Sequence, residues 1–222
     1  VAAVTLRDAA AALQNYTPEL AQAVREGESK TDHYEDILGT YLVKLSTLKI
    51  SENDSSEAAM LLKALSDFER IGDHALNILE SAEELKSKNL ALSAAARHEL
   101  NVLLRVEEIV DMTFQAFRDD DLEKAYRVEP LEQVIDDLKE KMRIHHILRM
   151  QQGSCSIESG FVWSDLLTAL ERVGDHCSNI AGCVIDLHHH NMNTHEAIRS
   201  ARMENENFDD EYKAYAVKYS LK

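Results

Sequence analysis

The segment "FERIGDHALNI" (Phe68–Ile78) occurs a second time, with few changes, as "LERVGDHCSNI" (Leu170–Ile180). The glutamate, arginine, glycine, aspartate, histidine and asparagine of the first copy all recur in the second, 102 residues further along. A segment repeated at a fixed offset within 222 residues indicates an internal duplication. Because most of the repeated residues are polar, hydrophobic packing alone does not explain why both copies carry them.

The composition predicts an all-helical protein. Only two prolines and seven glycines occur, and 45% of the residues are hydrophobic, a balance that favours long helices. With the duplication, it predicts an all-α fold of two tandem antiparallel three-helix bundles and a short extra N-terminal helix. The expected divisions are residues 1–16 for that helix, 17–119 for the first bundle and 120–222 for the second.

Charge and cysteine content narrow the classes of function. The formal net charge of −16 argues against nucleic acid as a partner, because binding phosphates requires clustered lysine and arginine. Three cysteines without a Cys-x-x-Cys pattern favour a reducing compartment over a disulfide framework. No run approaches the roughly 20 apolar residues that cross a bilayer. The chain begins with Val1 instead of Met, so we expect that a membrane portion can precede it.

Capping residues and breaks predict the boundaries of the helices. Thr17 and Pro18 suit the N-cap and the first position of a helix. The segment "SENDSSE" predicts a loop in which Ser55 or Ser56 caps the next helix, and Gly153 predicts a helix end. We expect helices over about 2–15, 18–50, 56–88, 93–118, 122–151 and 157–190.

Each copy of the repeated segment places two carboxylates along one edge of a helix. Glu69 and Asp73 are four residues apart, so they are neighbours with about 5–6 Å between their Cβ atoms. Both lie beside the apolar stripe of their helix, and Glu171 and Asp175 take the same positions in the second copy. Gly72 and Gly174 lie between acids and stripe, which indicates either a close backbone approach or tight helix packing.

The helix before each copy carries a similar pair, Glu28 and Asp32 in the first half and Glu132 and Asp136 in the second. Helices joined by a short loop are usually antiparallel neighbours, so four carboxylates are expected to meet in each half. Such a group repels itself unless some members are protonated or a cation lies among them. Oxygen ligands favour hard cations such as magnesium, calcium, manganese or iron. The pattern therefore predicts one metal site in each half.

Other polar side chains lie close to these acids in the sequence. Four of them belong to the repeated segment and two to the helix over 93–118, and they could contact or extend the sites: His74, Asn77, His176, Asn179, Glu107 and Asp111. A bundle-surface position is an equally good interpretation of the histidines. The run His188–His190 is more typical of a polar helix end than of a chelating site.

The segments "ERIGDH" and "ERVGDH", each preceded by a helix with a Glu-xxx-Asp pair, resemble the PhoU family of phosphate-uptake regulators. The resemblance covers about residues 10–190 and implies tandem three-helix bundles that bind metal clusters through these motifs. It assigns the metal-binding role to eight residues, Glu28, Asp32, Glu69, Asp73, Glu132, Asp136, Glu171 and Asp175.

One branch of that family is more similar. "YLVKLSTLKIS" (Tyr41–Ser51) and "IHHILRMQQGSCSIE" (Ile144–Glu158) resemble the cytosolic PhoU-like tail of bacterial sodium/phosphate cotransporters. The stretch after Asn191 departs from the family, since "MENENFDDEY" interrupts the expected final helix.

The resemblance implies a metal-binding regulatory domain without enzymatic activity that controls phosphate uptake as the soluble tail of a sodium/phosphate cotransporter. Its place is then the cytoplasmic side of the inner or plasma membrane, as part of a membrane protein. A stand-alone PhoU-type regulator is the alternative. The expected cofactors are divalent or trivalent metal ions, either iron, zinc, manganese or magnesium. The expected partners are a membrane transporter domain or the phosphate transport machinery, phosphate held through the metal, and a second copy in a homodimer.

Two other functions stay open from the residues alone. A ferritin-like di-metal oxidase would use Glu-x-x-His pairs, but the chain has only Asp186-x-x-His189. A metal-free helical adaptor would use its acids to bind a basic partner, and metal analysis of the purified protein separates it from a metal-binding regulator.

Overall fold

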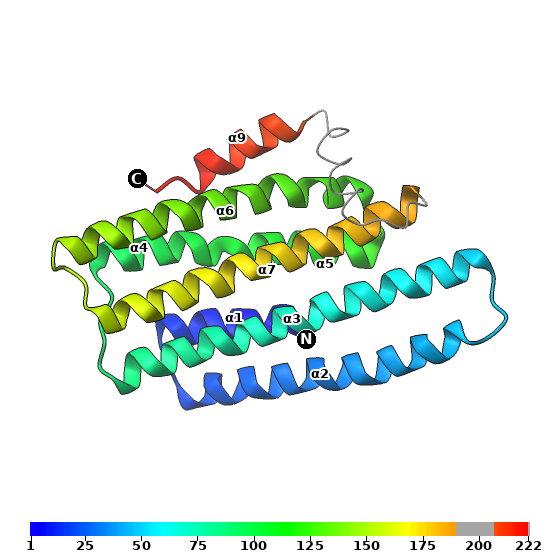
Figure 1. Ribbon diagram of the computed structural model, residues 1–222, viewed down its shortest axis with the longest axis horizontal. Coiled ribbons are helices and arrows are strands. Elements are labelled where there is room, and N and C mark those ends of the chain that lie inside the picture. The colour runs from blue at the N-terminus through cyan, green and yellow to red at the C-terminus, as the bar shows by residue number, and fades with distance from the viewer. Residues whose placement is uncertain (190–206, 222) are drawn as a thin grey trace.

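The structure, a computed structural model, describes residues 1–189 and 207–221, and every regular element in these ranges is a helix. This confirms the predicted all-α class. The elements in chain order are α1 (Ala2–Gln14), α2 (Pro18–Ser46), α3 (Glu52–Ser87), α4 (Ala94–Leu103), the 3-10 turn η1 (Leu104–Val106), α5 (Glu107–Asp119), α6 (Leu122–Gln151), α7 (Ile157–His189) and α9 (Phe208–Lys218). Figure 1 shows the long helices side by side.

The helices form two groups of three. Helix α1 packs against α2 and α3, α5 packs against α6 and α7, and the two groups meet where α3 contacts α7. Helix α9 packs on α6 (Figure 1) as an additional helix. The predicted divisions at 16/17 and 119/120 stay a prediction. In the structure the helix within 1–16 packs with α2 and α3, and α5 packs with α6 and α7.

The packing of α1 with α2 and α3 has a physical reason. An offset of 102 residues relates α1 to the segment of η1 and α5, so the unit that was duplicated begins before the helix that carries the first acid pair. Helix α1 has a full buried face, formed by Ala2, Thr5, Leu6, Ala9, Ala10 and Ala12. Such a face buries apolar surface as a bundle helix does.

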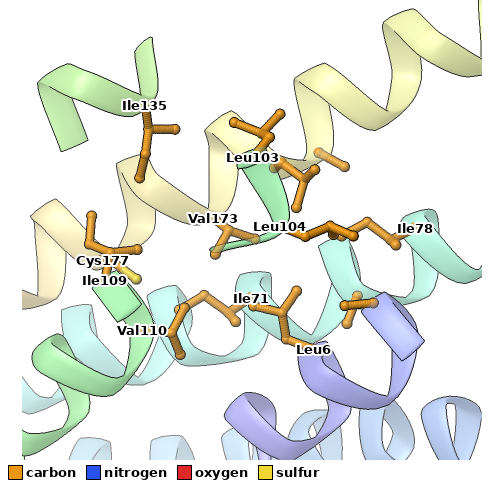
Figure 2. Close-up of a cluster of buried hydrophobic side chains, with 14 of the residues drawn as sticks. Leu6, Ile71, Ile78, Leu103, Leu104, Ile109, Val110, Ile135, Val173 and Cys177 are labelled. Atoms are coloured by element: carbon orange, nitrogen blue, oxygen red, sulfur yellow. The ribbon is translucent and has the colours of Figure 1, made fainter. Parts of the chain in front are cut away.

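The main core lies between α3 and α7, with side chains from α1, α5 and α6 around it (Figure 2). Ile71 and Ile78 of α3 and Val173 and Cys177 of α7 are completely buried there. The repeated segments thus carry apolar residues on one face, which join the two bundles, and acids on another. Burying a large aliphatic side chain stabilises the fold by about 1.5–3 kcal/mol, so this seam fixes the positions of both acid-bearing helices.

Capping decides where the long helices begin and end. Thr17 accepts a hydrogen bond from the Leu20 amide with Pro18 at the first position, and Gly153 has a positive φ of 68° after α6, both as predicted. The cap of α3 is Ser51 instead of Ser55 or Ser56. Ser51 and Asp54 form a reciprocal capping box, so the expected loop "SENDSSE" is helical from Glu52 onward.

In the described part of the chain, no helix combines the length and the apolar character that a bilayer span requires. The expected final helix begins in the stretch after Asn191, and 190–206 lie outside the described residues. The described C-terminal helix α9 places Tyr215 in contact with Arg127 of α6, whose guanidinium lies 3.4 Å from the tyrosine hydroxyl. Lys218 pairs with Glu108 of α5 at 2.6 Å.

Candidate metal centres

The first cluster lies between α2, which provides Glu28 and Asp32, and α3, which provides Glu69 and Asp73. Arg70 borders it, with Nε 3.6 Å from Glu69 Oε2 and Nη1 3.2 Å from Asp73 Oδ2. Glu28, Glu69 and Asp73 are half-buried and Asp32 is exposed. The structure thus brings the four predicted acids to one seam between two antiparallel helices.

Burial and mutual repulsion perturb the first cluster. Burial, then the charge of Asp73, raises the pKa of Glu69 to about 7, against the opposing effect of Arg70. Burial and the charges of Asp73 and Asp32 also raise the pKa of Glu28. Both shifts mean that ionised carboxylates at this seam are held at a cost in free energy. A bound cation would remove that cost.

The second cluster gathers its ligands more tightly. Glu132 and Asp136 of α6 and Asp175 of α7 each offer one oxygen, and these oxygens all lie within 4.8 Å of one another. Among the described residues, no other group of three potential ligands meets this separation. Glu132 is buried, whereas Asp136 and Asp175 are half-buried. Three carboxylates at this separation form a plausible site for a hard cation.

The fourth acid of the second cluster, Glu171, is bound by a lysine. The Nζ atom of Lys139 on α6 lies 2.6 Å from Glu171 Oε1. Arg172 repeats the role of its counterpart in the first cluster, with Nη1 3.0 Å from Asp175 Oδ2 and Nε 3.7 Å from Glu171 Oε2. Burial, followed by the charge of Glu171, raises the pKa of both Asp136 and Asp175.

Lys139 is the site residue that the sequence analysis missed. The duplication could have revealed it, because the shift that takes Asp32 to Asp136 takes Glu35 to Lys139. The two clusters therefore have opposite charges at one matching position.

The two glycines of the repeat do not mark a close backbone approach. A Cβ atom at Gly72 would lie 3.4 Å from Cβ of Thr31, and one at Gly174 would lie 3.7 Å from Ile135 Cδ1, which are ordinary contact distances. The close approach is instead at Gly27 on α2, where a Cβ atom would lie 3.0 Å from Thr5 Cγ2 and still nearer to Thr5 Oγ1. Tight helix packing is thus the better explanation of Gly72 and Gly174.

The repeated histidines lie between the two halves. His74 and His176 stack with ring centroids 5.4 Å apart and an interplanar angle of 27°. His176 Nδ1 lies 2.8 Å from Asp67 Oδ1, which also accepts a hydrogen bond from Asn179 at 3.1 Å. Burial, then the charge of His176, lowers the pKa of His74 to about 4. These contacts make the histidines part of the α3–α7 seam, and Asp67 is a partner that the sequence did not indicate.

Asn77 lies 3.4 Å from Nδ1 of His74 and so belongs to the same seam. The remaining candidates, Glu107 and Asp111, lie on α5. Asp111 on α5 pairs with Arg7 of α1, and Glu107 is half-buried on the same helix. Neither belongs to the group of close ligand oxygens in the described residues.

The histidine run and the Asp186-x-x-His189 pair lie only partly within the described residues. His188 Nε2 lies 3.1 Å from Asp120 Oδ1. The side chain of His189 and all of His190 lie outside the described residues. Asp186 is buried.

The residues present fit a hard metal ion. All eight predicted ligands are carboxylates, the donor type that magnesium, manganese and iron accept. The Oε2 atom of Glu171 is buried and accepts no hydrogen bond within the described structure. Burial first, and then neighbouring carboxylates, raise the pKa values of Glu28, Glu69, Asp136 and Asp175. An added positive charge in either cluster would therefore stabilise the ionised groups.

Comparison with protein families matches the PhoU domain to residues 1–82 and 101–184. These two segments fall on the two packing groups, one on α1–α3 and the other on α4–α7. The two matched segments of this chain thus contain both acid clusters and all eight predicted ligands.

Several known proteins are similar along most of the chain. The phosphate-specific transport system accessory protein PhoU homolog 1 of Thermotoga maritima is 28% identical over 189 residues, covering 82% of this chain and 78% of that protein. The accessory protein PhoU of Serratia marcescens is 29% identical over 181 residues, covering 79% and 72%.

Two solved structures have a similar fold. The crystal structure of PhoU from Pseudomonas aeruginosa matches with a TM-score of 0.80 and 25% identity, covering 85% of this chain and 90% of that one. The phosphate transport system regulatory protein PhoU from Streptococcus pneumoniae matches with a TM-score of 0.71 and 21% identity, covering 84% and 87%, and supports the fold alone.

Proposed function

This chain belongs to the PhoU family, and on that premise we propose that it is a regulator of phosphate transport whose two carboxylate clusters bind metal ions. The observation that carries the metal assignment is the close group formed by Glu132, Asp136 and Asp175. The raised pKa of Glu69 supports the same assignment for the first cluster. Relatives named as accessory proteins of phosphate-specific transport systems support the regulatory role.

The role is non-enzymatic. The acids and the arginine of each cluster, with Lys139 in the second, are charged groups at the surface of a helix pair. They bind and orient an ion and carry out no reaction. A bound metal ion supplies the positive charge that a phosphate anion requires and that a chain of net charge −16 otherwise provides only sparsely. Phosphate binding through the metal would then let the domain respond to phosphate.

The relatives favour one of the two arrangements expected from the sequence. The similar proteins reported above are named as accessory or regulatory proteins of phosphate transport. They support the stand-alone regulator better than the tail of a sodium/phosphate cotransporter. We propose the phosphate transport machinery as the partner in either arrangement, and the cytoplasmic side of the membrane as the place where they meet.

Metal content and phosphate binding test the proposal. Purified protein is exposed in turn to iron, manganese, zinc and magnesium, desalted, and analysed for bound metal. Phosphate is then titrated by calorimetry into metal-loaded protein and into protein kept in EDTA. We expect retained metal, and heat of phosphate binding only with the metal-loaded protein. A protein that retains none of these ions and gains no thermal stability from them would be a metal-free helical adaptor.

A further inference from the structure

At one pair of matching positions the two clusters carry side chains of opposite charge. Glu35 on α2 lies three residues after Asp32, and Lys139 on α6 lies three residues after Asp136. Replacing an acid by a base makes the second cluster two charges less negative than the first at this position. The bordering arginine is common to both clusters and cannot account for any difference between them.

Lys139 contacts its carboxylate in a partly enclosed setting. The side chains of Lys139 and Glu171 are only 25% and 14% exposed, and their charged atoms lie 2.6 Å apart. An ion pair at this burial is screened less by water than a surface pair. In the first cluster the counterpart of Glu171 is Glu69, which faces the negative charge of Glu35 instead of a lysine.

Within the second cluster, the group of close ligand oxygens leaves out the acid that Lys139 holds. It contains three of the four acids, Glu132, Asp136 and Asp175, and leaves out Glu171, the one that pairs with Lys139. A metal ion that used Glu171 would have to displace the ammonium group or lie beside it with a charge of the same sign. The lysine thus competes with metal for one ligand of the second cluster.

We propose that Lys139 sets the metal capacity of the second cluster, because it holds Glu171 and restricts metal binding there to Glu132, Asp136 and Asp175. In the first cluster Glu35 occupies the matching position, so no lysine at that position competes with metal for Glu69. This inference rests on the proposed metal-binding function and adds that the two sites are unequal in affinity or in the number of ions held.

Manganese binding in the full chain tests the inference. The second cluster is isolated by replacing Glu69 and Asp73 with alanine, and manganese is titrated with calorimetry and with electron paramagnetic resonance. In this background Lys139→Gln, and more strongly K139E, should tighten manganese binding about tenfold or add a second bound ion. Lys141→Gln is the matched control, since Lys141 is an exposed lysine of the same helix, and it should change binding less than twofold.

The reciprocal change tests the first cluster. With Glu171 and Asp175 replaced by alanine, Glu35→Lys should weaken manganese binding about tenfold. Thermal unfolding in EDTA shows whether each variant still folds. If the parent binds manganese but the Lys139 variants bind it as the parent does, the inference about Lys139 is wrong and the proposed function stands. If no variant and no parent protein binds manganese, both are wrong.

Discussion

The two acid clusters descend from one duplicated unit, yet the second is the more enclosed. Asp32 of the first cluster is exposed, whereas its counterpart Asp136 is half-buried, and Glu28 is half-buried where Glu132 is buried. Among the described residues, α2 has its main contacts with α1 and α3, whereas α6 packs against α4, α5, α7 and α9. The acids recur in both halves while the surrounding helices change, so burial and charge can adjust each site separately.

The largest expected effect comes from removing one acid pair at a time. Glu69→Ala with Asp73→Ala should remove the stabilisation that metal gives through the first cluster, and Glu171→Ala with Asp175→Ala should do the same for the second. A ligand at 100 times its Kd stabilises the folded state by about 2.7 kcal/mol, so each double variant should lose up to about this much. Urea unfolding with and without manganese measures the loss.

The control removes the same amount of charge from positions outside the clusters. Glu57→Ala with Glu80→Ala takes two exposed acids from α3 and should keep the full stabilisation by metal. If the control loses as much as the variants of the cluster, the effect of metal is a general one on net charge. If only one cluster variant loses stabilisation, the other cluster does not bind manganese under those conditions.

The next largest effect is on the pH dependence of the free energy of unfolding of the metal-free protein, to which the two clusters contribute differently. The pKa of Glu69 rises from 4.5 to about 7 on folding, so between these values the folded state binds more protons than the unfolded state. The contribution of Glu69 to the free energy of unfolding in EDTA should therefore fall as pH rises from about 4.5 to 7. The contribution of His74, whose pKa is lowered to about 4, rises over an overlapping range, so the parent must be compared with a variant at Glu69. Glu69→Gln should flatten this fall. Unfolding in urea at pH 5 and pH 8 measures it.

The second cluster also lowers the free energy of unfolding as pH rises, because the pKa values of Asp136 and Asp175 are raised in the folded state. Some slope should thus remain in Glu69→Gln. Metal should reverse the trend, since an ion binds the ionised carboxylates and its stabilising effect grows with pH. If the stabilities of the parent and of Glu69→Gln change by the same amount between pH 5 and pH 8, the raised pKa of Glu69 is contradicted.

Much of this architecture can be predicted from local sequence. The spacing of apolar residues indicates the long helices, and Thr17, Pro18 and Gly153 mark ends that the structure confirms. The spacing of acids along single helices, as for Glu69 and Asp73, also places them on one edge. These features depend on residues within a turn or two of one another, and helix geometry is the same wherever a helix packs.

Apart from the antiparallel pairs that carry the acids, features that depend on which helices meet were not predicted. The assignment of α1 to the first bundle follows from its packing on α3, which no local pattern states. The stacking of His74 on His176 likewise requires α3 to contact α7. The pair of Lys139 with Glu171 joins two helices and needs the register between them. The capping box of Ser51 is the exception, because its residues are local and it was overlooked.

Replacing three glycines by alanine compares how tightly the helices pack at these positions, with smaller expected changes in stability. Gly174→Ala should stabilise the protein by about 0.5–1 kcal/mol, since a Cβ there finds ordinary contacts and alanine favours the helix. Gly72→Ala should do nearly the same. Gly27→Ala should instead destabilise by about 1–3 kcal/mol, because a Cβ there overlaps Thr5, which is buried. Urea unfolding of the three variants in EDTA checks the order.

A second substitution makes the contact at Gly27 testable in its own right. Thr5→Ser removes the methyl group that lies 3.0 Å from the position of the new Cβ and should recover part of the stability lost in Gly27→Ala. Equal costs at all three glycines would mean that the α1–α2 contact is no tighter than the seams that hold the acid clusters.

The smallest expected effects concern the serines that begin α3 and α7. Ser51 accepts from the Asp54 amide at 3.1 Å, and Ser156 accepts from the Ser159 amide at 3.1 Å. Replacing either serine by alanine should cost about 1 kcal/mol, and replacing it by glycine only a few tenths. Urea unfolding in EDTA measures both.

The two N-cap serines have different hydrogen-bond partners, and this difference predicts which alanine substitution is more destabilising. The Ser51 amide donates a second bond to Asp54 Oδ2 at 3.3 Å, and the Ser51 hydroxyl donates to the same oxygen at 2.8 Å, at an exposed end of the α2–α3 hairpin. The hydroxyl of Ser156 instead lies 3.0 Å from that of Ser159, which is buried. Loss of a partner is more costly for a buried polar group, so Ser156→Ala should cost more than Ser51→Ala. The reverse order would mean that the capping box at α3 outweighs the buried hydroxyl pair at α7.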